Sequence, residues 1–136
     1  MSMPGISPNG QFVAYQSNES GYWEVFVTRF PEGKGKWQVS VNGGMHPRWN
    51  GTGDELLYVE TGTDILMAVP VDSADVFRMD LPQQLFKVNN ASDNMRMYDV
   101  MPDGQRFVVV QDVEDETPRK TITVVENWYK EFEDQK

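Results

Sequence analysis

The sequence predicts an all-β protein of about three four-stranded antiparallel sheets, the last one incomplete, with a short C-terminal helix. Three observations support this fold class. A segment with a glycine at its fourth position occurs three times along the 136 residues. An apolar run follows each copy, and the later parts of each repeat are rich in the β-branched and aromatic residues that favour strands.

Each copy of the repeated segment is predicted to form a turn that leads into a strand. The copies align without gaps over residues 7–15, 50–58 and 101–109, and their glycines, Gly10, Gly53 and Gly104, are 43 and 51 residues apart. Asn or Asp followed by glycine is typical of turns, because glycine adopts positive φ without a Cβ clash. All-β repeats of about 40 to 50 residues are typical of propeller blades.

The first two repeats each have room for four strands. An inner strand is expected before each turn, and the apolar run after the turn has apolar residues on both faces, as in a strand covered on both sides. The strands expected in the first blade (about 3–45) span 3–6, 12–15, 23–30 and 37–41. Those expected in the second (about 46–95) span 46–49, 56–59, 64–71 and 84–88.

The third repeat (about 96–127) shows three strands, expected at 97–100, 107–110 and 121–125. Ile6, Trp49 and Val100 fall at one aligned position, which is expected to fill the space between blades. After residue 126 the apolar period changes to that of a helix, because Trp128 and Phe132 are four residues apart among charges. An amphipathic helix is therefore expected over 127–134.

The pattern of inner strand, Pro-Asn/Asp-Gly turn and apolar strand resembles the TolB-like, or WD-repeat-like, β-propeller repeat. The segments that carry the resemblance are His-Pro-Arg-Trp-Asn at 46–50, Leu-Met-Ala-Val-Pro-Val at 66–71, Tyr-Asp-Val-Met-Pro-Asp-Gly-Gln-Arg-Phe at 98–107 and Ile-Thr-Val-Val-Glu-Asn-Trp at 122–128. The chain looks like the C-terminal part of a larger propeller, and similar endings occur in some bacterial kinase-linked and Tol-system proteins. The resemblance implies a binding module and a ring of six to eight blades.

Composition argues against several classes of protein. The net charge of −9 disfavours nucleic acid and anionic membrane surfaces as partners. The absence of cysteine excludes disulfides and thiolate metal sites, and the single histidine makes other metal or cofactor chemistry hard to assemble, so neither a metal nor a cofactor is expected. The N-terminal residues lack the pattern of a signal peptide, which predicts a cytoplasmic location, although a longer parent propeller could be periplasmic.

Three blades cannot close a ring, and this predicts self-association. An uncovered blade face of several hundred Å² would forfeit on the order of 10 kcal/mol at roughly 25 cal/mol per Å². Two chains that join head to tail would close a six-bladed ring, with Ile6, Trp128, Tyr129 and Phe132 as interface candidates. A piece of a longer propeller and a rearranged closed β structure are the alternatives, and another protein is a further possible partner.

The channel of such a ring would be lined by inner strands. His46, Arg48 and Asn50 would share one face of a regular strand, and Asp99 aligns with Arg48 in the next repeat. These four residues are therefore candidates for ligand binding, with mutual pairing across the channel as the simpler interpretation.

The sequence contains no catalytic motif. It lacks a Gly-x-Ser-x-Gly elbow and a phosphate-binding glycine loop, and no spacing of carboxylates indicates a glycosidase pair. A non-catalytic β-propeller module for binding and assembly is therefore predicted, with no catalytic residues. The alternative is a glycosidase- or hydrolase-type enzyme with carboxylates in the channel.

Overall fold

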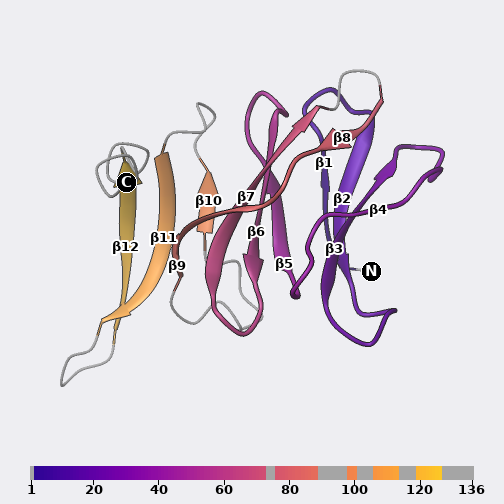
Figure 1. The fold of residues 1–136 in the computed structure, drawn as a ribbon. Helices are drawn as coiled ribbons and strands as arrows, with labels where there is room; N and C mark the ends of the chain where they lie inside the picture. The colour runs from indigo at the N-terminus through magenta and orange to yellow at the C-terminus, as the bar shows by residue number, and fades with distance from the viewer. Residues whose placement is uncertain (1, 73–75, 89–97, 101–105, 114–118, 127–136) are drawn as a thin grey trace.

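A computed structural model shows an all-β chain built from three antiparallel sheets (Figure 1). It describes residues 2–72, 76–88, 98–100, 106–113 and 119–126. For the third sheet, the structure gives the order of the strands and the residues that pair between them. No described segment is helical, and the helix predicted for 127–134 lies outside the described residues. Within these ranges, no helix could cross a membrane.

The first sheet is a four-stranded meander in the order β1-β2-β3-β4. Its strands are β1 (Ser2–Ile6), β2 (Phe12–Ser17), β3 (Glu24–Arg29) and β4 (Trp37–Gln38). All four lie where the sequence predicts strands, although β4 is two residues long and ends before the predicted limit at residue 41.

The second sheet has the same order of strands with one addition. It contains β5 (Met45–Trp49), β6 (Glu55–Glu60), β7 (Ile65–Asp72) and β9 (Gln83–Lys87), and β8 (Arg78–Met79) pairs with the end of β7. Strand β8 has no counterpart among the strands predicted from the sequence. The segment around it returns toward the first sheet, as Figure 1 shows.

The third sheet contains β10 (Tyr98–Val100), β11 (Arg106–Val113) and β12 (Arg119–Glu126), in that order. Strands β11 and β12 pair in register from Arg106↔Glu126 to Val113↔Arg119. Both are longer than the predicted strands, because the pairing continues into the polar residues on either side of the connection.

The register between the first two strands of each sheet repeats along the chain. Ile6 pairs with Val13, Trp49 pairs with Leu56, and Val100 pairs with Phe107. In each pair the partner lies seven residues further along the chain. The three residues that the sequence aligned therefore occupy equivalent positions in the three sheets.

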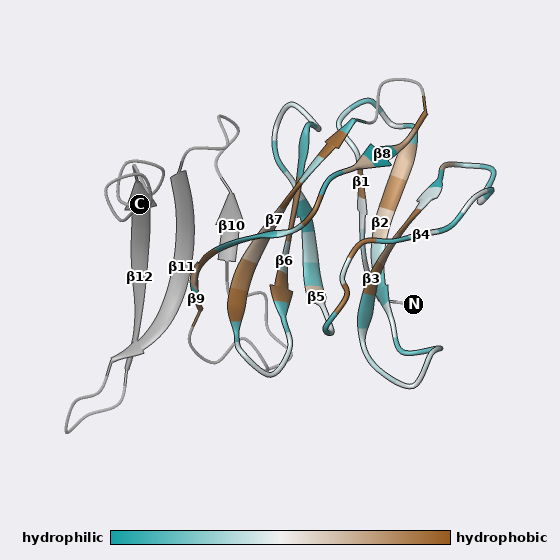
Figure 2. Cartoon of the chain, viewed as in Figure 1, coloured by the Kyte–Doolittle hydropathy of each residue, from teal (hydrophilic) through white to brown (hydrophobic). Residues whose placement is uncertain are grey.

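One apolar cluster joins the first two sheets. Figure 2 shows the hydrophobic stretches of β6 and β7, which contribute to it, in brown. The cluster's members from β2, β3 and the residue after β4 are Phe12, Ala14, Val25, Val27 and Val39, and those from the second sheet are Leu56, Tyr58, Met67, Val69, Val71 and Phe77. Because side chains alternate along a strand, the intervening residues of β6 and β7 face the other way. They are also buried, on the side where the third sheet lies in Figure 1.

Candidate functional site

Strand β5 carries two of the predicted channel residues, and it is irregular. His46 is buried and has a left-handed backbone, with φ at 59°. Its backbone N–H donates to Oε1 of Gln16 in the first sheet, at 2.8 Å. The pairing of β5 with β6 shifts register between Met45 and Arg48. The regular strand on which His46, Arg48 and Asn50 were expected to share one face is therefore not formed.

Asn50 lies just after β5 and closes the turn into β6. Its Oδ1 accepts hydrogen bonds from the N–H groups of Gly53 (2.9 Å) and Glu55 (3.2 Å). Its Nδ2 donates to Oδ1 of Asp54 at 2.5 Å. The side chain is buried, and its oxygen and nitrogen are both engaged within the turn.

Arg48 and Asp99 lie on the inner strands of neighbouring sheets. Arg48 is half-buried and pairs with Leu57 across β5 and β6. Asp99 pairs with Val108 across β10 and β11. The approach of the two charges across a channel stays a prediction.

Among the interface candidates, Ile6 is exposed. Its side chain retains 53% of its accessible surface, although it occupies the strand position that Trp49 holds in the second sheet. Trp49 packs against the cluster between the sheets, and its Nε1–H donates to the carbonyl of Gly5 at 2.9 Å. The other candidates, Trp128, Tyr129 and Phe132, lie outside the described residues.

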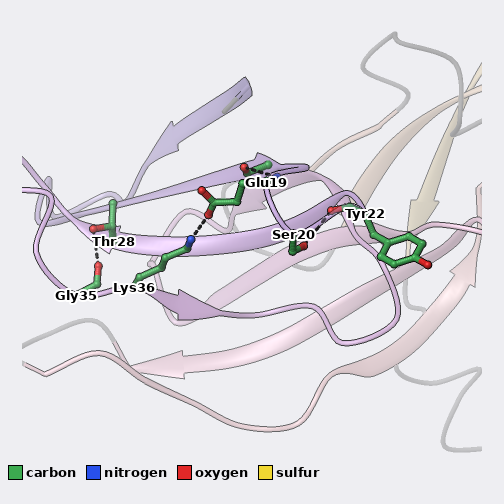
Figure 3. Close-up of polar contacts among 7 residues, drawn as sticks. Glu19, Ser20, Tyr22, Thr28, Gly35 and Lys36 are labelled. Atoms are coloured by element: carbon green, nitrogen blue, oxygen red, sulfur yellow. Dashed lines mark hydrogen bonds and ion pairs between the residues drawn. The ribbon is translucent and has the colours of Figure 1, made fainter.

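The outer face of the first sheet, which looks away from the second sheet, is partly covered by its own loops. Tyr15 and Phe26 stack with ring centroids 5.8 Å apart, and burial raises the pKa of the Tyr15 phenol. The Nζ of Lys36 lies 4.5 Å from the Phe26 ring centroid and forms an ion pair with Glu19 (Figure 3). The charged pair therefore covers the aromatic part of this face and leaves the Ile6 end open.

A further set of buried polar groups lies between the first two sheets. Glu24, Tyr58 and Glu60 come from β3 and β6, and all three are buried. The sequence analysis did not single them out, because 34 residues separate Glu24 from Tyr58 and no motif spacing connects them. The detectable signal was an acidic residue at one terminus of each apolar strand, first in β3 and last in β6, which is common in acidic proteins.

An open groove lies between the end of β7 and β8. Its lining residues are Pro70, Val71, Asp72, Arg78, Met79 and Asp80, and its volume is about 300 Å³. The groove is shallow and contains none of the predicted site residues.

Comparison with known proteins identifies a relation at the level of the fold. No family model matches the sequence, and no curated protein matches it. Among solved structures, TolB from Acinetobacter baumannii superposes with a TM-score of 0.61 over 90% of this chain, at 13% sequence identity. The chain spans 29% of the length of that TolB chain. The likeness shows that the chain has a TolB-like fold, with sheets arranged as in part of a β-propeller.

Proposed function

We propose that this chain is a non-catalytic β-propeller module for binding and assembly, and that its first sheet docks on a further propeller sheet. The observation that carries the proposal is the exposure of Ile6 at the position where Trp49 is packed in the second sheet. The partner sheet that we propose is the third sheet of a second copy, so that two chains form one six-bladed ring.

The repeat supports the docking direction. Trp49 and its strand partner Leu56 face the first sheet, since both pack in the cluster between the two sheets. Ile6 and its partner Val13 occupy the same register in the first sheet and therefore face away from the second. In a propeller this outward position is covered by the preceding blade.

The magnitude of the apolar gain favours reversible assembly. Ile6 is 53% exposed and Phe30 is 42% exposed, whereas Tyr15 and Phe26 are already buried. Full burial of a fully exposed side chain of this kind stabilises by about 1.5–3 kcal/mol. Both side chains are already about half-buried, so each junction gains roughly 2 kcal/mol from these two residues. Two equivalent junctions in a closed pair double that gain to roughly 4 kcal/mol. A micromolar dimer needs about 8 kcal/mol, so the other contacts of the two faces must supply the remainder.

Two of the channel candidates are held by hydrogen bonds within the fold, and this supports the non-catalytic part of the proposal. Asn50 is held inside its turn, and the backbone of His46 is fixed by Gln16. Inner-strand residues with such roles are tied to the fold and are poorly placed to rearrange around a substrate. Hydrolysis of aryl glycosides or esters by the purified chain, abolished by Asp99→Asn, would favour the hydrolase alternative.

Light scattering after size exclusion tests the assembly. At micromolar concentration the chain is expected to have about twice its 15.6 kDa monomer mass. Ile6→Glu places a charge in the proposed junction and is expected to weaken the dimer at least about 100-fold, because a charge there cannot be buried without a partner. Val76→Glu is the matched control. Val76 is 52% exposed, like Ile6, but lies between β7 and β8, outside the proposed junction.

A monomeric wild-type chain would contradict self-association and would leave another protein as the partner of this face. Equal weakening by the two substitutions would show that the junction is not at Ile6.

A further inference from the structure

Two carboxylates and a phenol lie buried at one end of the seam between the first and second sheets. Glu24 and Glu60 are each 8% exposed, and Tyr58 is fully buried. Among the described residues, neither carboxylate forms an ion pair with Lys or Arg. Both carboxylates accept hydrogen bonds, but no described Lys or Arg balances their charge. A cation bound at this end of the seam would offset the cost of burying these charges.

The connection from β4 to β5 holds the Glu24 carboxylate and packs against the Tyr58 ring. Glu24 accepts hydrogen bonds from the Ser40 hydroxyl and from the Gly43 N–H, the latter at 3.0 Å. The next residue, Gly44, lies against the Tyr58 ring, since a Cβ on Gly44 would be 3.1 Å from Tyr58 Cδ2. The Tyr58 ring therefore packs beside the loop that holds the Glu24 carboxylate.

Glu60 reaches the same place from the second sheet. It lies two residues after Tyr58 on β6, so both side chains are on one face of that strand. The following residue, Thr61, contacts Gly43, because its Oγ1 is 1.8 Å from the place where a Cβ on Gly43 would lie. Glu60 therefore lies next to a residue that contacts this loop. The Glu60 carboxylate accepts a hydrogen bond from the Thr63 hydroxyl at 2.9 Å.

The Tyr58 hydroxyl is an unsatisfied polar group at this place. It is buried and has no hydrogen-bond partner among the described residues. A buried hydroxyl without a hydrogen-bond partner lowers the free energy of unfolding by about 1–3 kcal/mol. Such groups are therefore rare in folded proteins. Burial raises the pKa of this phenol first, and the negative charges of Glu60 and Glu24 raise it further, so the hydroxyl lies within electrostatic reach of both carboxylates.

We propose that Glu24, Tyr58 and Glu60, here called the seam site, bind a hard divalent cation of the Ca²⁺ type. Carboxylate and hydroxyl oxygens are the ligands that such an ion prefers. The ion would balance the two carboxylates and use the oxygen of the neutral phenol, directly or through a bound water. Within the described ranges, no group of three acidic or imidazole side chains forms a metal cluster. With two carboxylates the expected Kd is therefore weak, on the order of 0.1–1 mM.

Thermal unfolding of the full chain tests the seam site, with CaCl₂ compared against NaCl at equal ionic strength. With Ca²⁺ at about ten times its Kd, the Tm of the wild type is expected to rise by about 5 °C. Glu60→Gln is expected to lower the affinity for Ca²⁺ at least about 10-fold. Glu32→Gln makes the same change of charge at an exposed turn position and is expected to keep the full rise.

Tyr58→Phe gives an independent readout of the same site. Without Ca²⁺ it is expected to raise the Tm, because it removes the unsatisfied hydroxyl. With Ca²⁺ it is expected to show a smaller rise than the wild type, because one oxygen ligand is lost. A wild-type Tm that does not respond to Ca²⁺, as expected if a water alone fills the site, would overturn the proposal. An equal Ca²⁺ response in Glu60→Gln would also overturn it, and neither result bears on the proposed assembly.

Discussion

Asn50 closes the turn between β5 and β6 with both ends of its amide. Its oxygen accepts from two backbone N–H groups, and its nitrogen donates to the Asp54 carboxylate, which also accepts from the Thr52 hydroxyl at 2.8 Å. In the first sheet, the Ser7 hydroxyl accepts from the N–H of Phe12 in the equivalent turn. The second turn lacks the proline found in the other two turns. The side-chain amide of Asn50 holds the backbone of this turn by hydrogen bonds.

The turn gives a pH dependence that can be measured. Hydrogen bonds from Asn50 and then from Thr52 lower the pKa of Asp54 below its ordinary value of 3.8. A lowered folded-state pKa contributes stability above pH 3.8, and this contribution is lost as the pH falls through the folded value. Asp54→Asn is expected to lower the free energy of unfolding by about 1 kcal/mol at neutral pH.

Urea unfolding of the two proteins across the acid range checks this prediction. The difference between them is expected to stay constant near neutral pH and to shrink below pH 3.8. A difference that is the same at every pH would show that the Asp54 charge has no part in the turn.

Residue types alone did not determine the roles of the inner-strand side chains. His46 adopts a left-handed backbone, which is uncommon for a residue with a Cβ, and the Gln16 side chain from another sheet holds its N–H. Neither feature has a signal in the sequence around residue 46. The predicted shared face of His46 and Arg48 assumed a regular strand, and the contact with the first sheet removes that regularity.

At the scale of elements, turn chemistry and apolar runs were sufficient to predict the strands. Gly10 and Gly53 have φ of 75° and 78°, as the aligned turns require. The seven-residue register then places Ile6, Trp49 and Val100 at equivalent positions. These features are local, so they could be predicted from sequence.

Strand β8 and the seam site could not be predicted in this way. Strand β8 is two exposed residues, and its neighbour Phe77 is held by rings from three other segments. Glu24 and Glu60 belong to different sheets and meet only through the packing of those sheets. Such contacts depend on tertiary structure, for which a single sequence shows no periodic pattern.

The β4–β5 connection joins the first two sheets, and Gly43 in this connection packs against Thr61. Gly43 has φ of 86°, and a Cβ would lie 1.8 Å from Thr61 Oγ1. Gly43→Ala is therefore expected to destabilise the chain by at least about 2 kcal/mol, through backbone strain and overpacking together. Thermal or urea unfolding measures this loss.

Gly62→Ala is the matched control for that substitution. Gly62 has nearly the same φ, 88°, and nothing lies within 4 Å of the place where its Cβ would be. Only the cost of left-handed strain is expected, about 1 kcal/mol. Equal losses for the two variants would mean that the close contact with Thr61 relaxes freely and does not constrain the seam.

At the scale of the whole molecule, the first two sheets share one core. Phe77 lies between them, with its ring centroid 5.4 Å from that of Phe12, 5.1 Å from that of Trp37 and 6.5 Å from that of Trp49. Phe77 comes from the segment between β7 and β9, so a connection of the second sheet packs against the first sheet. The two sheets are therefore expected to unfold as one cooperative unit, because neither keeps its apolar face covered alone.

Phe77→Ala tests that cooperativity. The substitution removes a buried ring that touches both sheets and is expected to cost about 3–5 kcal/mol, whereas Leu81→Ala, at a position 79% exposed, is expected to cost less than about 0.5 kcal/mol. Tryptophan fluorescence reports on the four tryptophans of the chain, among them Trp37 and Trp49, which pack against the shared core. Urea unfolding followed by this fluorescence is expected to coincide with unfolding followed by circular dichroism in wild type and variant. Two separated transitions in the variant would show that the sheets hold their structure independently, and that Phe77 acts on one of them alone.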